Sequence, residues 1–176
     1  MSKLQLRLRN AKLVEAVVAT VAIGTLMVLS AGVTPAAASE VTRSAVVSAS
    51  APEVWSAIGG FCAIKDWHPA IGTCSEDGKT PPTRTLVTKD GKVTFVEMQV
   101  ARDEAGRTYS YNFVSSPFPV SEYVGTISVT PNDDATSTVT WHGVYTANAG
   151  KEKEANDDFA AVYEAGLAAL QAKYAN

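Results

Sequence analysis

Histidine, cysteine and basic residues are scarce in this chain of 176 residues, which has two histidines, two cysteines, and 15 Lys and Arg against 18 Asp and Glu. Two thiols and two distant imidazoles provide no compact set of metal ligands, so we expect no metal site. The shortage of Lys and Arg argues against nucleic acid as a partner, because contacts with phosphate supply most of that affinity. The sequence also has no Ser-His-Asp order, phosphate-binding loop or dinucleotide fingerprint, and we expect no cofactor.

The first 38 residues differ from the rest. They carry four basic side chains and one acidic one, followed by the uncharged and mostly apolar run Ala16–Val33, then Pro35 and three alanines that end at Ala38. This order is typical of a secretory signal peptide with an A-x-A-like cleavage site. We therefore predict a signal peptide at 1–38 and one folded domain at 39–176, whose eleven basic and seventeen acidic residues make it acidic.

An uncleaved N-terminal membrane anchor is the alternative, because the eighteen residues of the apolar run approach the length that spans a hydrocarbon core. Under both interpretations the folded domain is exported. We expect a periplasmic or secreted protein with no stable membrane insertion after cleavage.

Export affects how Cys62 and Cys74 are interpreted, because a disulfide persists in an oxidising compartment. A bond between them would close a loop of thirteen residues and contribute about 3 kcal/mol in the chain-entropy model. Two buried, reduced cysteines that pack as small apolar groups are the alternative, and the sequence alone does not decide between the two.

The pattern of apolar residues predicts one sheet and one long helix. A hydroxyl, an early proline and an acid in Ser50–Glu53 predict a short helix, which Gly59 and Gly60 would end, and a second short turn is expected at 62–66. Strands are predicted at 41–48, 71–75, 83–89, 93–101, 107–114, 121–130 and 136–146, and a helix from 151 to about 173. The expected fold is α+β: a curved, seven-stranded antiparallel sheet covered by the C-terminal helix.

This order of elements, together with several local strings, resembles the START-like helix-grip (SRPBCC) superfamily. The strings are PEVWSAIGGF at 52–61, DWHP at 66–69, DGKVTFVEMQVARDEAGRTYSYNF at 90–113 and SSPFPVSEYVGTISV from Ser115. Within the superfamily the sequence is similar to the polyketide cyclase/dehydrase-type branch, some of whose exported members resemble an accessory protein of methanol oxidation.

The resemblance implies a cavity between the sheet and the final helix that holds a small apolar or amphipathic molecule. Strand parity agrees, because Tyr109, Tyr111 and Phe113 share one face of their strand. The residues expected to bind the ligand are Trp67, His68, Phe95, Glu97, Tyr111, Phe113, Phe118, Tyr123, Trp141, Phe159 and Tyr163.

Glu97 is the main polar candidate, because in plant hormone receptors, which belong to the same superfamily, a glutamate in this strand context points into the cavity. Burial would raise its pKa, and a carboxyl group in an apolar pocket can hold a ligand hydroxyl or act as a general base. The alternative is reversed parity, which would turn Val96 and Met98 inward and leave Glu97 in solvent.

His68 is the second candidate, because Pro69 would extend the backbone there and could present the imidazole near the cavity mouth. A histidine that caps the short helix or is simply exposed is the alternative, and His142 is expected to face outward. Phe118, between two prolines, is expected to close over the cavity, and the alternative is an ordinary rigid hairpin loop with this ring packed at its base. Gly72 stands where the hormone receptors place a lysine, so we expect no cavity cation and a neutral or phenolic ligand.

Three functions remain open. The first is an exported protein that binds a small hydrophobic molecule without covalent chemistry. The second is a cyclase or dehydratase in which Glu97 or His68 transfers a proton. The third is an accessory module that docks on an exported dehydrogenase, with its acidic surface steering the encounter.

Overall fold

The computed structural model describes residues 38–175, so the predicted signal peptide lies outside the described residues apart from Ala38. The elements in chain order are β1 (Ser39–Val47), α1 (Ala51–Ile58), α2 (Ile64–Trp67), β2 (Ile71–Glu76), β3 (Thr83–Thr88), β4 (Thr94–Asp103), β5 (Thr108–Ser115), β6 (Val120–Pro131), β7 (Ser137–Ala147) and α3 (Glu152–Lys173). Within residues 38–175, no helix combines the length and the apolar character needed to cross a membrane.

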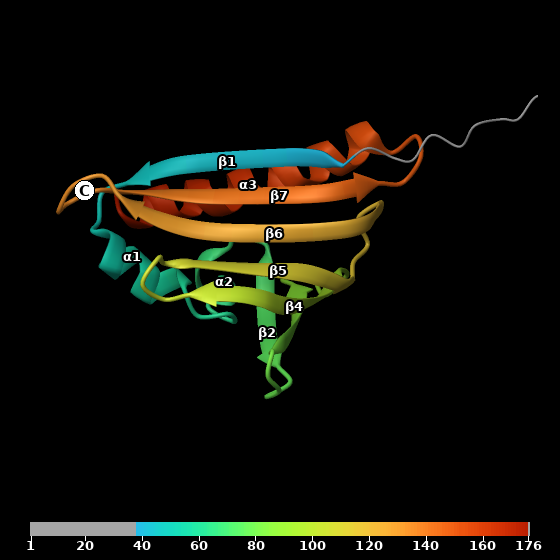
Figure 1. Ribbon diagram of the computed structural model, residues 1–176, viewed down its shortest axis with the longest axis horizontal. Helices are drawn as coiled ribbons and strands as arrows, with labels where there is room; N and C mark the ends of the chain where they lie inside the picture. The colour runs from blue at the N-terminus through green and yellow to red at the C-terminus, as the bar shows by residue number, and fades with distance from the viewer. Residues whose placement is uncertain (1–37, 176) are drawn as a thin grey trace, which may run out of the picture. The chain divides into compact units, whose positions relative to one another are not determined.

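The seven strands form one antiparallel sheet in the order β1-β7-β6-β5-β4-β3-β2. Figure 1 shows α3 lying along β1 and β7, against which it packs. The two short helices connect β1 to β2, which are the two edges of the sheet. The predicted helix-grip fold is therefore confirmed. The predicted ends were wrong by one or two residues, since β1 begins at Ser39 and β4 continues to Asp103.

Local chemistry explains where the helices begin and what they bury. Ser50 precedes α1, and its hydroxyl accepts a hydrogen bond from the Glu53 amide at 3.4 Å, which satisfies one of the free N–H groups of the first turn. In α3 the buried positions recur at helical spacing and form one stripe against the sheet. Its members are Ala155, Phe159, Tyr163, Gly166, Leu167 and Leu170.

Strands β5 and β6 separate towards one end. Their register runs from Thr108 opposite Ser128 to Asn112 opposite Val124 and stops there. Beyond this point the end of β5 pairs only with β4, and the start of β6 pairs only with β7. A polar space of about 270 Å³ lies between the separated strands. It is bounded by residues 113–116 and 120–123.

Candidate functional site

A small cavity of about 40 Å³ lies between the inner face of the sheet and α3. Every strand except β1 contributes to its walls, together with α2, α3 and two loops. It is lined by Ile64, His68, Ile71, Leu86, Phe95, Glu97, Tyr111, Phe113, Phe118, Tyr123, Trp141, Phe159, Val162 and Tyr163. This volume corresponds to about three water molecules, at roughly 10–15 Å³ each.

Ten of the eleven residues that the sequence predicts to bind a ligand line this cavity. Trp67 does not. Its side chain is buried against His68 and Trp141, with ring centroids 5.7 Å away in each case. Four further lining residues were not predicted: Ile64, Ile71, Leu86 and Val162. Each is an apolar residue in an alternating or helical pattern, and that pattern was the available signal.

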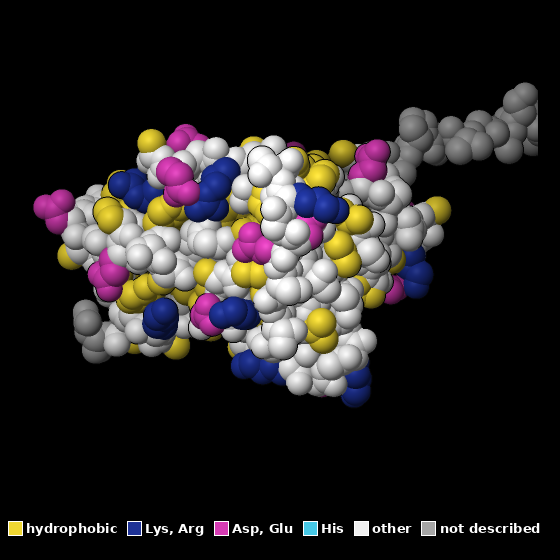
Figure 2. Space-filling view, turned by 90° about the horizontal axis from the view of Figure 1, so that it is seen from below, with side chains coloured by type: hydrophobic (Ala, Val, Ile, Leu, Met, Phe, Trp, Pro, Cys, Tyr) yellow, Lys and Arg dark blue, Asp and Glu magenta, His cyan; other side chains and the backbone are white. Residues whose placement is uncertain are grey.

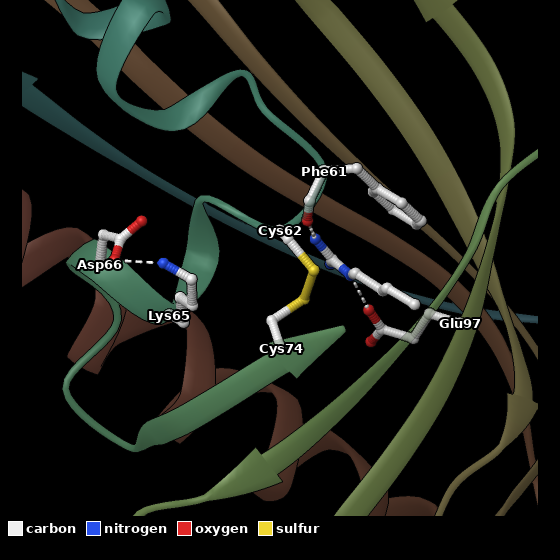
Figure 3. Close-up of a disulfide and its surroundings, with 7 residues drawn as sticks. Phe61, Cys62, Lys65, Asp66, Cys74 and Glu97 are labelled. Carbon is white, nitrogen blue, oxygen red and sulfur yellow. Dashed lines mark hydrogen bonds and ion pairs between the residues drawn. A yellow bond between two sulfur atoms is a disulfide. The ribbon is translucent and has the colours of Figure 1, made fainter. Parts of the chain in front are cut away.

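A buried ion pair lies at the cavity wall. Arg84 on β3 and Glu97 on β4 are register partners, and Nε of Arg84 donates to Oε2 of Glu97 at 2.6 Å. Their side chains are 0% and 6% exposed. Nη1 of Arg84 also donates to the carbonyl oxygen of Phe61. Figure 3 shows this carbonyl and the Glu97 carboxylate, with the dashed lines that mark both interactions.

Aromatic rings complete the surroundings of Arg84. The centre of its guanidinium group lies 4.2 Å from the ring centroid of Phe61 and 4.9 Å from that of Tyr111. Both distances are within the range of cation–π attraction. The positive charge is thus held by one carboxylate, one carbonyl and two ring faces, all on neighbouring elements.

Arg84 does not line the cavity, but it lies directly behind Glu97 and supplies a buried cation that the sequence did not lead us to expect. In β3 the side chains of Arg84 and Leu86 share the inner face, and an arginine at such a position is compatible with the core only when a buried carboxylate balances it. The pairing of Arg84 with Glu97 is not evident from the sequence. The site is nevertheless close to electrically neutral, because Glu97 and Arg84 offset each other.

Glu97 presents one oxygen to Arg84 and keeps the other available. Among the described residues no hydrogen bond reaches its Oε1, although Glu97 lines the cavity. Burial raises the pKa of Glu97, and the Arg84 guanidinium opposes this rise. The inner-face parity of Glu97 is the one that the resemblance implied, with Phe95 on the same side.

A chain of hydrogen bonds joins four aromatic side chains beside Glu97. Nε1 of Trp141 donates to the Tyr111 hydroxyl at 2.9 Å. The Tyr111 and Tyr123 hydroxyls are 3.1 Å apart, and those of Tyr123 and Tyr163 are 2.6 Å apart. Burial raises the pKa of Tyr111 and of Tyr123 well above the ordinary value, so these hydroxyls keep their protons.

Two glycines make room for this chain. Gly125 on β6 and Gly143 on β7 are register partners on the inner face of the sheet. A Cβ atom on Gly125 would overlap the Tyr123 hydroxyl, and one on Gly143 would overlap the Tyr163 hydroxyl. The absence of two side chains therefore creates the space into which the hydroxyls converge.

His68 is a buried structural residue in this arrangement. It follows α2 with an extended backbone, and its side chain is 3% exposed. Nε2 lies 3.0 Å from the carbonyl oxygen of Val162, and Nδ1 accepts from the Ala70 amide at 3.2 Å. These partners select the neutral tautomer with the proton on Nε2. Burial lowers the pKa of His68. Because both ring nitrogens are hydrogen-bonded, His68 has no free nitrogen for proton transfer. Its side chain is buried in the interior and not at the mouth of the cavity, where the sequence had placed it.

Four phenylalanine rings close the outer end of the cavity. Phe118, on the loop before β6, stands perpendicular to Phe95 with centroids 5.3 Å apart, and it also contacts Phe113 and Phe159 edge to face. Phe95, Phe113 and Phe118 are only partly buried. Of these four rings, that of Phe118 is the one carried by a loop, whereas the others lie on β4, β5 and α3.

A disulfide fixes the segment that carries Phe61. Cys62 and Cys74 are bonded, with Cα atoms 5.5 Å apart, and the bond ties the connection between α1 and α2 to β2 (Figure 3). Cys62 directly follows the residue whose carbonyl accepts from Arg84. The covalent link thus limits the movement of one partner of the buried cation.

Solved structures with the same fold include two from Bacillus. A protein of Bacillus thuringiensis is 32% identical, matches 78% of this chain and all of its own, and superposes with a TM-score of 0.74. The protein XoxI of Bacillus cereus is 33% identical. The match covers 77% of this chain and 95% of XoxI, with a TM-score of 0.73. An aromatase/cyclase of a Streptomyces species shares the fold at 18% identity. The match covers 78% of this chain and 94% of the aromatase/cyclase, with a TM-score of 0.63.

Comparison with curated proteins found no match to this chain. The family described as polyketide cyclase / dehydrase and lipid transport matches residues 38–175, which is the whole of the described domain. With two solved relatives above 30% identity covering more than three quarters of the sequence, the chain belongs to the polyketide cyclase / dehydrase and lipid transport family.

Proposed function

We propose that this protein binds a small, neutral, hydrophobic or amphipathic molecule between the sheet and α3. The observation that carries the proposal is the lining of the cavity, which is apolar and aromatic except at Glu97, His68 and the tyrosine hydroxyls. Burial of about 200 Å² of apolar ligand surface would contribute roughly 5 kcal/mol before the entropy costs of association. No covalent step is needed for this role.

The volume of the cavity sets a condition on binding. An apolar cavity that holds benzene measures about 150 Å³, whereas the resting cavity here measures about 40 Å³. A guest of that size therefore requires lining side chains to move, and we expect the partly buried ring of Phe118 to move first. Its loop lies at the end of the sheet where β5 and β6 have already separated.

Calorimetric titration with toluene and naphthalene tests the proposal. Phe118→Ala should bind naphthalene more tightly or faster than the wild type, because the ring that closes the cavity is gone. Val114→Ala is the matched control, since Val114 is a nearby apolar residue with 60% exposure. If neither probe binds to the wild type or to Phe118→Ala, the binding proposal is wrong.

A cyclase-type enzyme is a second candidate, favoured by the Oε1 atom of Glu97 that faces the cavity without a hydrogen bond from the described residues. Such a base would remove a proton next to a carbonyl group. Deuterium incorporation at the central carbon of acetylacetone, followed by NMR, would then be faster with wild-type protein than with Glu97→Gln. Equal rates would exclude Glu97 as the base, and His68 lacks a free nitrogen for this step.

We further propose that the domain is exported, as the basic and apolar leader predicts. The disulfide supports this, because such bonds persist mainly in oxidising compartments. Mass spectrometry of protein from the periplasm or medium should find an N-terminus near Ser39, whereas an intact Met1 end in the membrane fraction would favour the anchor.

We also propose an exported protein partner, because residues 39–176 carry an excess of acidic over basic side chains. On the face shown in Figure 2, basic and acidic side chains are interspersed, so this face offers no single-sign patch for steering. A pull-down from the periplasm at low and high salt would test for a dominant partner.

A further inference from the structure

The hydrogen atoms of the Trp141–Tyr163 chain outnumber its hydrogen bonds. The indole N–H of Trp141 and the hydroxyls of Tyr111, Tyr123 and Tyr163 supply four hydrogens, while three hydrogen bonds join the four groups. Each bond uses one hydrogen. Among the described residues no other acceptor lies within hydrogen-bond distance of these hydroxyls, so one O–H hydrogen has no protein acceptor.

The direction of the chain places this hydrogen at Tyr163. Trp141 can only donate, so Tyr111 accepts from it. Hydrogen bonds that run in one direction polarise one another, which favours donation from Tyr111 to Tyr123 and from Tyr123 to Tyr163. The hydroxyl hydrogen of Tyr163 is then the free one. Tyr163 lines the cavity from α3.

An acceptor without a donor faces the same space. Oε1 of Glu97 receives no hydrogen bond from the described residues, while Oε2 is held by Arg84. Glu97 and Tyr163 both line the same cavity of about 40 Å³, Glu97 from β4 and Tyr163 from α3. They do not bond to each other directly. A buried donor and a buried acceptor that both lack partners are each costly, and one group that is both acceptor and donor would satisfy the two together.

We propose that this group is the hydroxyl of a phenol, so that the ligand is a flat, neutral molecule with a phenolic hydroxyl at its inner end. This inference rests on the proposed binding function. The hydroxyl oxygen accepts from Tyr163, and its hydrogen goes to Oε1 of Glu97. The ring would lie against the aromatic side chains that line the cavity, among them Phe113, Tyr123 and Phe159.

Three probes of similar size separate the contributions. Phenol can accept and donate, anisole can only accept, and toluene can do neither. Titration of the wild type and of Phe118→Ala by calorimetry should give phenol an affinity at least about tenfold higher than that of anisole or toluene, since a hydrogen bond to a charged group in a buried site is strong. In Phe118→Ala the ring at the outer end of the cavity is absent, so entry of the probe into the cavity should not limit binding.

Variants then test the two polar partners. Tyr163→Phe and Glu97→Gln should each reduce the preference for phenol, and near-UV circular dichroism checks that the fold is kept. Tyr145→Phe is the matched control, because Tyr145 is a buried tyrosine on β7 that does not line the cavity. Its preference for phenol should equal that of the wild type.

The outcomes distinguish this inference from the function on which it rests. Equal affinities for the three probes would overturn the phenol assignment and leave the binding function intact. Failure of all three to bind, in the wild type and in Phe118→Ala, would overturn both. Retention of the full phenol preference in Tyr163→Phe and in a folded Glu97→Gln would also overturn the assignment.

Discussion

Arg84 and Glu97 are opposite each other on adjacent strands, and their side chains form an ion pair at 2.6 Å with almost no exposure to solvent. Removal of one partner leaves the other as an uncompensated buried charge, whereas removal of both replaces the pair by apolar packing. A single substitution should therefore cost more stability than the double substitution.

Arg84→Met should lower the free energy of unfolding by about 3–5 kcal/mol, and the double variant Arg84→Met, Glu97→Leu should recover most of that loss. Urea denaturation at neutral pH measures both. Lys153→Met is the control, because it removes an exposed pair with Asp157 and should leave stability essentially unchanged. A loss in Arg84→Met no larger than in the control would contradict the buried role of the pair.

Stability should fall as the pH is lowered through the titration of His68. Burial lowers the pKa of His68 in the folded state below its ordinary value of 6.5. The unfolded chain therefore binds a proton first, and stability decreases from about pH 6.5 down to the folded-state pKa, with a slope of at most about 1.4 kcal/mol per pH unit. His68→Gln should lack this slope in denaturation curves between pH 7 and pH 5. His142→Gln should keep it, and a slope that persists in His68→Gln would assign the effect to another group.

The disulfide should contribute to stability under oxidising conditions. The double variant Cys62→Ser, Cys74→Ser should lose about 3 kcal/mol, because the unfolded chain regains the freedom of the closed loop. Reductant should lower the midpoint of the wild type in urea towards that of the variant and should not affect the variant itself. A wild type that is insensitive to reductant, with its thiols shown to be free, would be inconsistent with this expectation.

Gly143→Ala should destabilise the protein by about 1–3 kcal/mol, because the added methyl group overlaps the Tyr163 hydroxyl. Tyr163→Phe in the same chain should relieve part of that cost. Gly60→Ala is a suitable comparison, since a Cβ atom there meets its nearest neighbour at an ordinary 3.5 Å. Thermal unfolding of the three variants would reveal the difference, and equal effects at positions 60 and 143 would argue against the close packing.

Periodicity predicted most of the fold, because the alternation in Thr108–Ser115 and the helical stripe of α3 are properties of single segments. The same alternation identified most of the cavity wall. The pairing of Arg84 with Glu97 could not be found in that way, since it depends on the register between two strands, which the pattern of either strand does not determine.

The hydrogen-bond partners of His68 also could not be predicted from the sequence. Its proton is fixed by the Val162 carbonyl, ninety-four residues later, and this contact exists only after α3 has packed against α2. The expectation of a group at the cavity mouth used the local effect of Pro69, which does place the backbone correctly. Backbone geometry was thus predictable, while the partners of the side chain were not.

The backbone pairing between β5 and β6 ends at Asn112 and Val124. Beyond this point β5 pairs with β4 and β6 pairs with β7. The rings of Phe113 and Tyr123, one from each strand, stack across the gap with centroids 4.2 Å apart, and both line the cavity. At this end of the sheet, cohesion between the two strands therefore comes from aromatic side chains instead of a ladder of backbone hydrogen bonds.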